Sequence, residues 1–239
     1  MRKRGLEASR ANVVSSFTIV KGTMIEESYA ALAAWDFDRT KRQNLDHVRE
    51  VNLVGAKSQT WLRDVGKVLN RRFDPAGRDR PLALLAKAGW GLDEWKPALL
   101  WHLTRDEFLF RDFLVGWLYP NWAGGAHRLR PEELYDFLRE VGRRGGVTEH
   151  AWGEATLERV AVGLLRMAAD FGLLKGTAVR EFASYHLPER SFLYLLHAFR
   201  DAEPNPRRLI ESRGWRMFLM EPADVERELL RLHQFQKLH

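Results

Sequence analysis

The sequence has no cysteine among its 239 residues. This absence excludes disulfide frameworks, zinc sites built on thiolates, iron–sulfur clusters and thiol catalysis. It is consistent with a cytoplasmic protein, the location we expect. Long apolar runs are also absent, because the most apolar stretch, FLFRDFLVGWLYPNWAGG, is interrupted by Arg111 and Asp112 and broken by Pro120. A membrane span needs about 20 apolar residues, so we expect no membrane partner and a buried helix in this stretch.

Motifs of enzymes and ligand sites are missing as well. The eight histidines form no HExxH pair, and no GxSxG elbow occurs. The glycine-rich GRRGG lacks the Lys-Ser/Thr that completes a phosphate-binding loop. The sequence therefore predicts a non-enzymatic protein with no catalytic residue, no cofactor and no metal.

The composition shows a large core and a mild basic excess. Hydrophobic residues make up 45% of the chain, and 38 Lys and Arg stand against 32 Asp and Glu, a formal net charge of +6. Such an excess favours a polyanionic partner only where the cations cluster. One small cluster, Arg2, Lys3 and Arg4, predicts a basic N-terminal arm.

Apolar residues recur at helical spacing through most of the chain, which predicts a mainly α, bundle-like protein. Capping patterns and a proline predict where helices begin. The predicted starts are at Thr23, Asp38, Ser58, Thr104 and Pro131.

A glycine-rich change of composition, RRGGVTEHAWGEA, predicts a boundary near residue 147. We expect a helical part over 1–147 and a smaller helical part over 148–239. The smaller part should contain a helix that ends at Gly172, followed by a short hairpin. These elements resemble a winged-helix piece with Lys175, Arg180 and His186 near its edge, although the pattern favours a helical domain with one stray hairpin.

The last residues, ERELLRLHQFQKLH, are still in helical rhythm, so we expect the protein to continue beyond His239.

The stretch KSQTWLRDVGKVLNRRF, residues 57–73, separates into two faces on a helical wheel. Trp61, Leu62, Val65, Val68 and Leu69 fall together and should be buried. The opposite face carries cations, amides and a hydroxyl, with one acid, Asp64, to neutralise it.

This polar face has the chemistry of a DNA-facing helix. Lys and Arg contact phosphates, whereas Gln, Asn and Arg can also reach base edges. The preceding helix and a break at Gly55 predict a helix-turn-helix-like N-terminal part. An ordinary solvated helix face remains the alternative. The predicted DNA-binding residues are Lys57, Gln59, Thr60, Arg63, Lys67, Asn70 and Arg71.

Five segments in this order resemble the BrxA family of bacteriophage-exclusion (BREX) defence systems. They are SFTIVKGTMIEESYAAL, NLVGAKSQTWLRDVGKVLNRRF, ATLERVAVGLLRMAADFGLLKG, SFLYLLHAF and ESRGWRMFLMEPADVERELLRL. The resemblance implies a small helical accessory protein that binds double-stranded DNA and partly resembles the antitermination factor NusB. It also implies a family pattern that continues past His239, and it carries over no catalytic residue.

We therefore expect a double-stranded DNA-binding accessory of a BREX system, with other BREX proteins as further partners. One alternative is an assembly adaptor whose interface is the aromatic middle, around Trp90, Trp95, Trp117 and Trp122. Another is an RNA-binding protein of the NusB kind.

Overall fold

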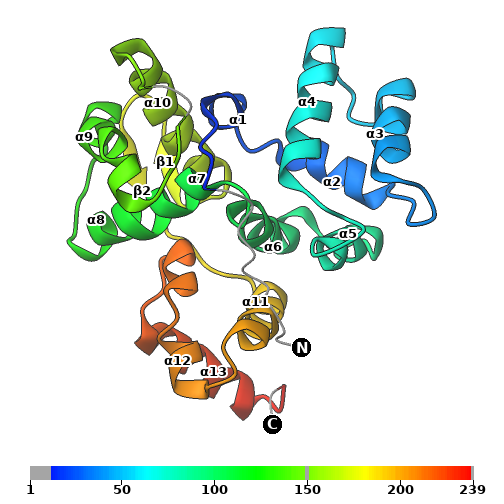
Figure 1. The fold of residues 1–239 in the computed structure, drawn as a ribbon. Helices are drawn as coiled ribbons and strands as arrows, with labels where there is room; N and C mark the ends of the chain where they lie inside the picture. Colours follow the sequence, from blue (N-terminus) through cyan, green and yellow to red (C-terminus); the bar gives the residue numbers. More distant parts are fainter. Residues whose placement is uncertain (1–11, 149–150, 238–239) are drawn as a thin grey trace, which may run out of the picture.

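The computed structural model describes residues 12–148 and 151–237. Within these residues the chain is mainly helical with a single two-stranded sheet, which confirms the predicted mainly α class. The basic arm predicted at Arg2, Lys3 and Arg4 lies outside the described residues. Figure 1 shows three neighbouring groups of helices, with α6 in the middle of the molecule.

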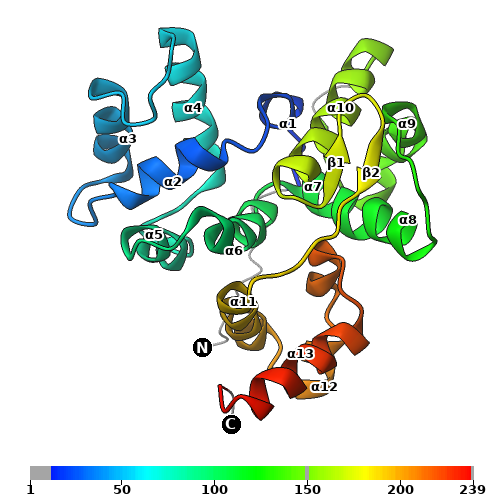
Figure 2. The same cartoon turned by 180° about the vertical axis from the view of Figure 1, so that it is seen from behind.

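The first group holds the predicted DNA-binding helix, α4. In it α2 packs on α5 and α3 packs on α4, while α1 lies between α4 and the second group in both Figure 1 and Figure 2. Its helices are α1 (Ser16–Lys21), α2 (Ile25–Ala33), α3 (Lys41–Glu50), α4 (Gln59–Arg72) and α5 (Arg80–Lys87).

The second group surrounds the long helix α10 and ends in the hairpin. Its first elements are α6 (Leu92–Thr104), α7 (Phe108–Phe113), the π-helix η1 (Leu114–Leu118) and α8 (Tyr119–Ala123). They are followed by η2 (Pro131–Leu134), α9 (Tyr135–Arg139), η3 (Val141–Arg144), α10 (Glu154–Asp170), β1 (Leu174–Gly176) and β2 (Arg180–Phe182).

The third group closes the described chain and contacts α6 through α11. Its elements are α11 (Glu189–Ala202), α12 (Pro206–Ile210), η4 (Arg213–Phe218) and α13 (Pro222–Gln234).

The hairpin forms where the sequence predicted it and gains a third extended neighbour. β1 and β2 are antiparallel, and the backbone groups of Leu129 and Arg180 exchange two hydrogen bonds of 2.8 and 3.0 Å. From α7 onward the helical stretch α7–η1–α8 is followed by the extended Leu129, by the short helices η2, α9 and η3, by α10 and by the hairpin, an order that resembles a winged helix with added short helices. This unit begins before residue 147 and ends after it. The predicted division there stays a prediction.

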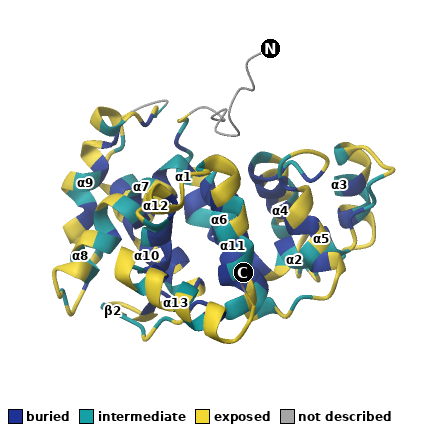
Figure 3. Ribbon diagram, turned by 90° about the horizontal axis from the view of Figure 1, so that it is seen from below, coloured by how far each residue is buried: buried dark blue, intermediate teal, exposed yellow. Residues whose placement is uncertain are grey.

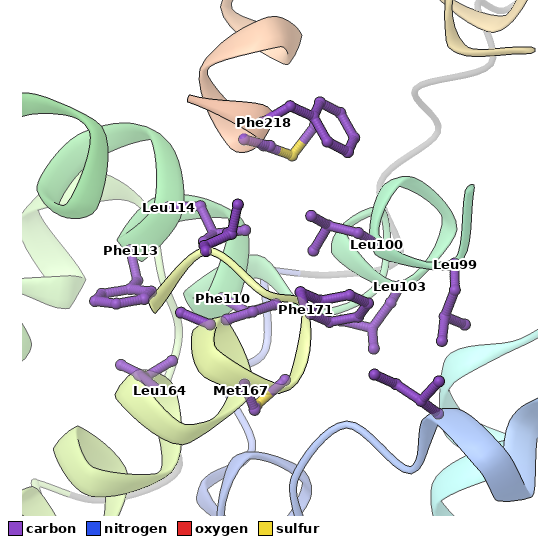
Figure 4. Packing of buried hydrophobic residues seen from close by; sticks show 14 of the residues in the cluster. Leu99, Leu100, Leu103, Phe110, Phe113, Leu114, Leu164, Met167, Phe171 and Phe218 are labelled. Carbon is purple, nitrogen blue, oxygen red and sulfur yellow. The ribbon is translucent and has the colours of Figure 1, made fainter. Parts of the chain in front are cut away.

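One continuous apolar core joins the three groups. Its centre is made by side chains from α6, α7, α10 and η4, which meet in Figure 4. They include Leu99, Leu103, Phe110, Phe113, Leu164, Met167 and Phe218, all buried. The stretch predicted as a buried helix is therefore central at α7 and η1, whereas α8 at its end has no buried residue.

Two of the predicted helix starts are confirmed. The Ser58 hydroxyl accepts a hydrogen bond of 3.1 Å from the backbone N–H of Trp61 and caps α4. Pro131 is the first residue of η2. The predicted stop also holds, because Gly172, which follows the C-cap residue Phe171 of α10, has φ +78° and suits the left-handed conformation that ends a helix.

The start predicted at Thr23 is wrong. The helix begins at Ile25, and its N-cap is Met24, which makes no side-chain cap. The Thr23 hydroxyl instead donates a hydrogen bond of 2.7 Å to Asp170 of α10. The Thr23 hydroxyl therefore bonds to a residue far away in the sequence and does not cap α2.

Two further predicted helix starts are wrong, because another residue begins the helix or the residue ends a helix. Thr40, not Asp38, caps α3, in a capping box with Gln43. Thr104 is the last residue of α6, and its hydroxyl donates to the carbonyl of Leu100. A Thr-x-x-Glu pattern is too short to distinguish a helix start from the end of the preceding helix.

A buried arginine at the end of α4 joins the first two groups. Arg72 is 0% exposed, and its Nε lies 3.0 Å from Oε1 of Glu107 in the link between α6 and α7. Its two Nη atoms donate to the carbonyls of Thr18, Gly22 and Thr23 at 2.8–3.0 Å. The Thr18 hydroxyl donates to the second oxygen of Glu107. Arg72 is therefore not available to a polyanion.

We expect Arg72→Ala to lower the free energy of unfolding by about 3–5 kcal/mol, because it leaves Glu107 buried without its counter-ion. Urea denaturation monitored by circular dichroism measures this loss. Arg63→Ala, on the exposed side of the same helix, is the matched control and should change stability by about 0.5 kcal/mol or less. Equal losses for the two variants would contradict the role assigned to Arg72.

A buried polar chain attaches the third group to α6. His102 Nδ1 lies 2.7 Å from Asp79, and its Nε2 lies 2.6 Å from the hydroxyl of Tyr194 on α11. Nearby, the Ser191 hydroxyl donates to the carbonyl of Glu94 at 2.6 Å. Burial lowers the pKa of His102 below its usual value, although Asp79 opposes the shift. The neutral ring donates to Asp79 and accepts from Tyr194.

This lowered pKa makes part of the stability dependent on pH. As the pH falls below about 6.5, the unfolded chain takes up the His102 proton before the folded chain does. His102→Gln should therefore cost most stability at pH 7.5, and the cost should shrink toward pH 5.5. Denaturation curves at several pH values test this, with the exposed His197→Gln as control. A cost for His102→Gln that is constant with pH would contradict the assignment.

Candidate nucleic-acid interface

Helix α4 has the two faces that the wheel predicts. Leu62, Val65, Val68 and Leu69 are buried, and Trp61 is half-buried. Figure 3 shows buried and exposed positions alternating along the helix. Six of the seven predicted DNA-binding residues are exposed, namely Lys57, Gln59, Thr60, Arg63, Lys67 and Asn70.

The seventh, Arg71, lies differently. It is half-buried, and its Nη2 donates a hydrogen bond of 2.8 Å to the carbonyl of Val13. The backbone carbonyl of Asn70 accepts a hydrogen bond of 2.6 Å from Lys41 of α3, while the Asn70 side chain stays exposed. The exposed polar face of α4 therefore extends from its N-terminal end to Lys67. At the C-terminal end it includes the side chain of Asn70 but not that of Arg71.

The single acid of this helix does not neutralise the outward cations. Asp64 is 6% exposed, and its carboxylate pairs with Lys21 of α1 at 2.7 Å. This contact lowers the pKa of Asp64 below its usual value, so the group is charged at neutral pH. Lys57, Arg63 and Lys67 form no ion pair with any carboxylate in the described part of the chain. Their charges face solvent as a group.

Helix α1 adds an aromatic ring and a cation beside this face. The Phe17 ring, 39% exposed, lies 5.6 Å from the ammonium of Lys21 and 6.0 Å from that of Lys67. The Lys21 ammonium also lies 5.9 Å from the Trp61 ring. Sequence reasoning missed Phe17 and Lys21, since nothing in the spacing of α1 indicates that it packs beside α4.

The link between α3 and α4 differs from the usual helix-turn-helix. It comprises residues 51–58, whereas such turns usually have three or four residues. The side chain of Asn52 closes this link by two hydrogen bonds, 2.8 and 3.0 Å, with the backbone of Ala56. The start of α4 is thereby fixed and exposed.

Helix α3 contributes cations that share one acid. Arg42, with its side chain 92% exposed, and Arg49 both pair with Asp46. The basic character of α4 therefore continues onto its neighbour.

Cations also lie around the hairpin, and some of them already have partners. Lys175 lies 3.8 Å from Glu181 on the paired strand, and Arg180 donates to the carbonyl of Gly176. His186 is exposed beyond the sheet. On α10, Arg159 donates to a backbone carbonyl of its own helix. Arg128 and Arg130, which flank Leu129 beside the hairpin, are exposed, so this edge also presents positive charge.

Residues 12–148 and 151–237 contain no set of three or more His, Asp or Glu side chains placed to hold a metal ion. The helices of these residues include none with the length and apolarity to cross a bilayer.

The chain is similar in fold to a solved protein of low sequence identity, an uncharacterized protein from Magnetospirillum magneticum. The TM-score is 0.63 at 15% identity, and the match covers 87% of this chain and 99% of the other. No curated protein matches the sequence.

The BrxA family model matches residues 15–198, which include α1, the whole of α4 and all of α10. The match extends over most of the chain and includes both the basic helix and the buried network around Arg72. The chain belongs to the BrxA family and is a component of a BREX phage-defence system.

Proposed function

We propose that this chain is a non-enzymatic accessory of its BREX system that binds double-stranded DNA through the exposed face of α4. The observation that carries the proposal is the group of cations Lys57, Arg63 and Lys67, which have no carboxylate partner within the described residues because Asp64 pairs with Lys21. Unneutralised cations on one helix face are what phosphate binding requires. Other BREX proteins are its further partners.

The exposed residues divide into two roles. Lys57, Arg63 and Lys67 contact phosphates, and these contacts provide affinity without sequence preference. Gln59 and Asn70 are placed to reach base edges, where Gln and Asn recognise adenine by two hydrogen bonds. Arg71 is left out of the phosphate contacts, because it holds the carbonyl of Val13.

The adaptor alternative loses one of the four rings first assigned to it. Trp95 is 0% exposed, and its indole N–H donates to the carbonyl of Leu82. Trp117 is half-buried and stacks on Phe113 with ring centroids 5.5 Å apart. Trp90 and Trp122 are half-buried as well, so the adaptor alternative keeps three partly exposed rings.

Arg63→Glu with Lys67→Glu should abolish the gel shift of a DNA duplex at about 0.15 M salt. Each lost phosphate contact also reduces the slope of log K against log salt by about 0.9, so the double variant should lose about 1.8. Binding measured by fluorescence anisotropy at several salt concentrations gives both quantities.

A matched control is Arg207→Glu with Arg208→Glu, the same change of charge on the exposed α12. This control should bind like the wild type, and circular dichroism should show that both variants fold. Wild-type retention by the α4 variant would remove this helix from the mechanism. Competition by an RNA duplex as strong as that by DNA would favour the RNA-binding alternative.

A further inference from the structure

A surface pocket of about 400 Å³ lies where the first two groups of helices meet. Its walls come from the link between α1 and α2, the first turns of α2 and α6, the start of α4 and the end of α10. Its size is in the range of small-molecule sites, which often lie between structural units. The pocket shares Lys21 and Trp61 with the edge of the α4 face but does not include Arg63 or Lys67.

Three kinds of side chain line the pocket. An apolar part is formed by Trp61, Leu92 and Met24. Carboxylates come from Glu26, Glu27 and Asp170, and cations from Lys21, Lys96 and Arg166. The lining therefore combines a flat aromatic surface with acceptors and with positive charge.

The charges differ in how far they are already neutralised. Lys21 pairs with Asp64 at 2.7 Å, and Lys96 lies 3.3 Å from Asp93. Arg166 donates only to an uncharged group, the carbonyl of Val20 at 2.6 Å. Its positive charge is the one most available to a ligand.

The backbone beside the pocket has an uncommon conformation. Met24 has φ 52° and Gly22 has φ 86°. A left-handed conformation is unfavourable for a residue with a side chain, and such residues occur preferentially at binding sites. A Cβ atom on Gly22 would meet Nη2 of Arg166 at 3.0 Å, so the absence of a side chain at this position leaves room for the guanidinium.

The mixture of groups restricts the ligand. A simple cation is repelled by Arg166, and a simple anion is repelled by Glu26 and Glu27. A mononucleotide satisfies all three kinds of group, because its base stacks on an indole, its hydroxyls donate to carboxylates, and its phosphate pairs with a guanidinium.

We infer that this pocket binds one 5′-nucleotide, with the base against Trp61, the sugar hydroxyls toward Glu26 and Glu27, and the phosphate on Arg166. The nucleotide is a free ribonucleotide, because the 5′-terminal nucleotide of a DNA strand has no free sugar hydroxyl to donate to these carboxylates. The inference does not depend on duplex binding by α4.

Isothermal titration calorimetry of the full chain with AMP and with adenosine tests the inference. AMP should bind saturably, and Arg166→Gln should weaken it about tenfold or more, which is the effect of losing a charge-assisted hydrogen bond. The affinity for adenosine should be the same in Arg166→Gln and the wild type. Trp61→Leu should weaken both ligands.

Arg159→Gln, an exposed arginine on the same helix outside the pocket, is the matched control and should bind AMP like the wild type. Glu26→Gln removes an exposed carboxylate and provides a second variant that keeps the fold. The variant Arg63→Glu with Lys67→Glu should retain AMP binding, so failure of duplex binding and failure of this inference can be told apart.

A duplex that carries a single 5′-phosphorylated overhanging nucleotide, compared with a blunt duplex, tests whether the sugar hydroxyls are needed. Saturable AMP binding that depends on Arg166 supports the inference. A preference for the overhang that depends on Arg166, without AMP binding, overturns it, because that nucleotide has no free sugar hydroxyl. AMP binding that does not depend on Arg166 also overturns the inference.

Discussion

The buried pair of Arg72 and Glu107 is the contact on which the arrangement of the first two helical groups depends. Arg72 ends α4, Glu107 lies between α6 and α7, and the same guanidinium holds three carbonyls of α1 and the link that follows it. A buried charge is tolerated only with a counter-ion and satisfied hydrogen bonds. This requirement fixes where α1, α4 and α7 lie relative to one another.

The same contact sets the rotation of α4. Successive residues on a helix point about 100° apart, so fixing Arg72 inward turns Arg63 and Lys67 outward and leaves Arg71 at the side, against Val13. The ion pair between Lys21 and Asp64 supports this arrangement from α1. A core interaction thus determines which cations of one helix remain available to a polyanion.

Two neighbouring surfaces follow from this geometry, and they differ in charge. The outer face of α4 presents cations without acids, which suits the regular phosphates of a duplex. The pocket behind α1 combines Arg166 with three carboxylates and an indole, which suits a single nucleotide better than a charged backbone. Helix α1 lies between them, and its Lys21 reaches both.

The sequence by itself determined the helical class, the extent and two faces of α4, the cap at Ser58 and the hairpin after Gly172, because these depend on local periodicity and turn chemistry. Only the tertiary structure decided that Arg72 is buried while Arg63 is not, that Thr23 bonds Asp170 instead of capping α2, and that Lys21 neutralises Asp64. The sequence does not distinguish a charged side chain that faces water from one that pairs with a buried carboxylate. Its partner lies in a distant segment, and the pairing exists only once the helices have packed.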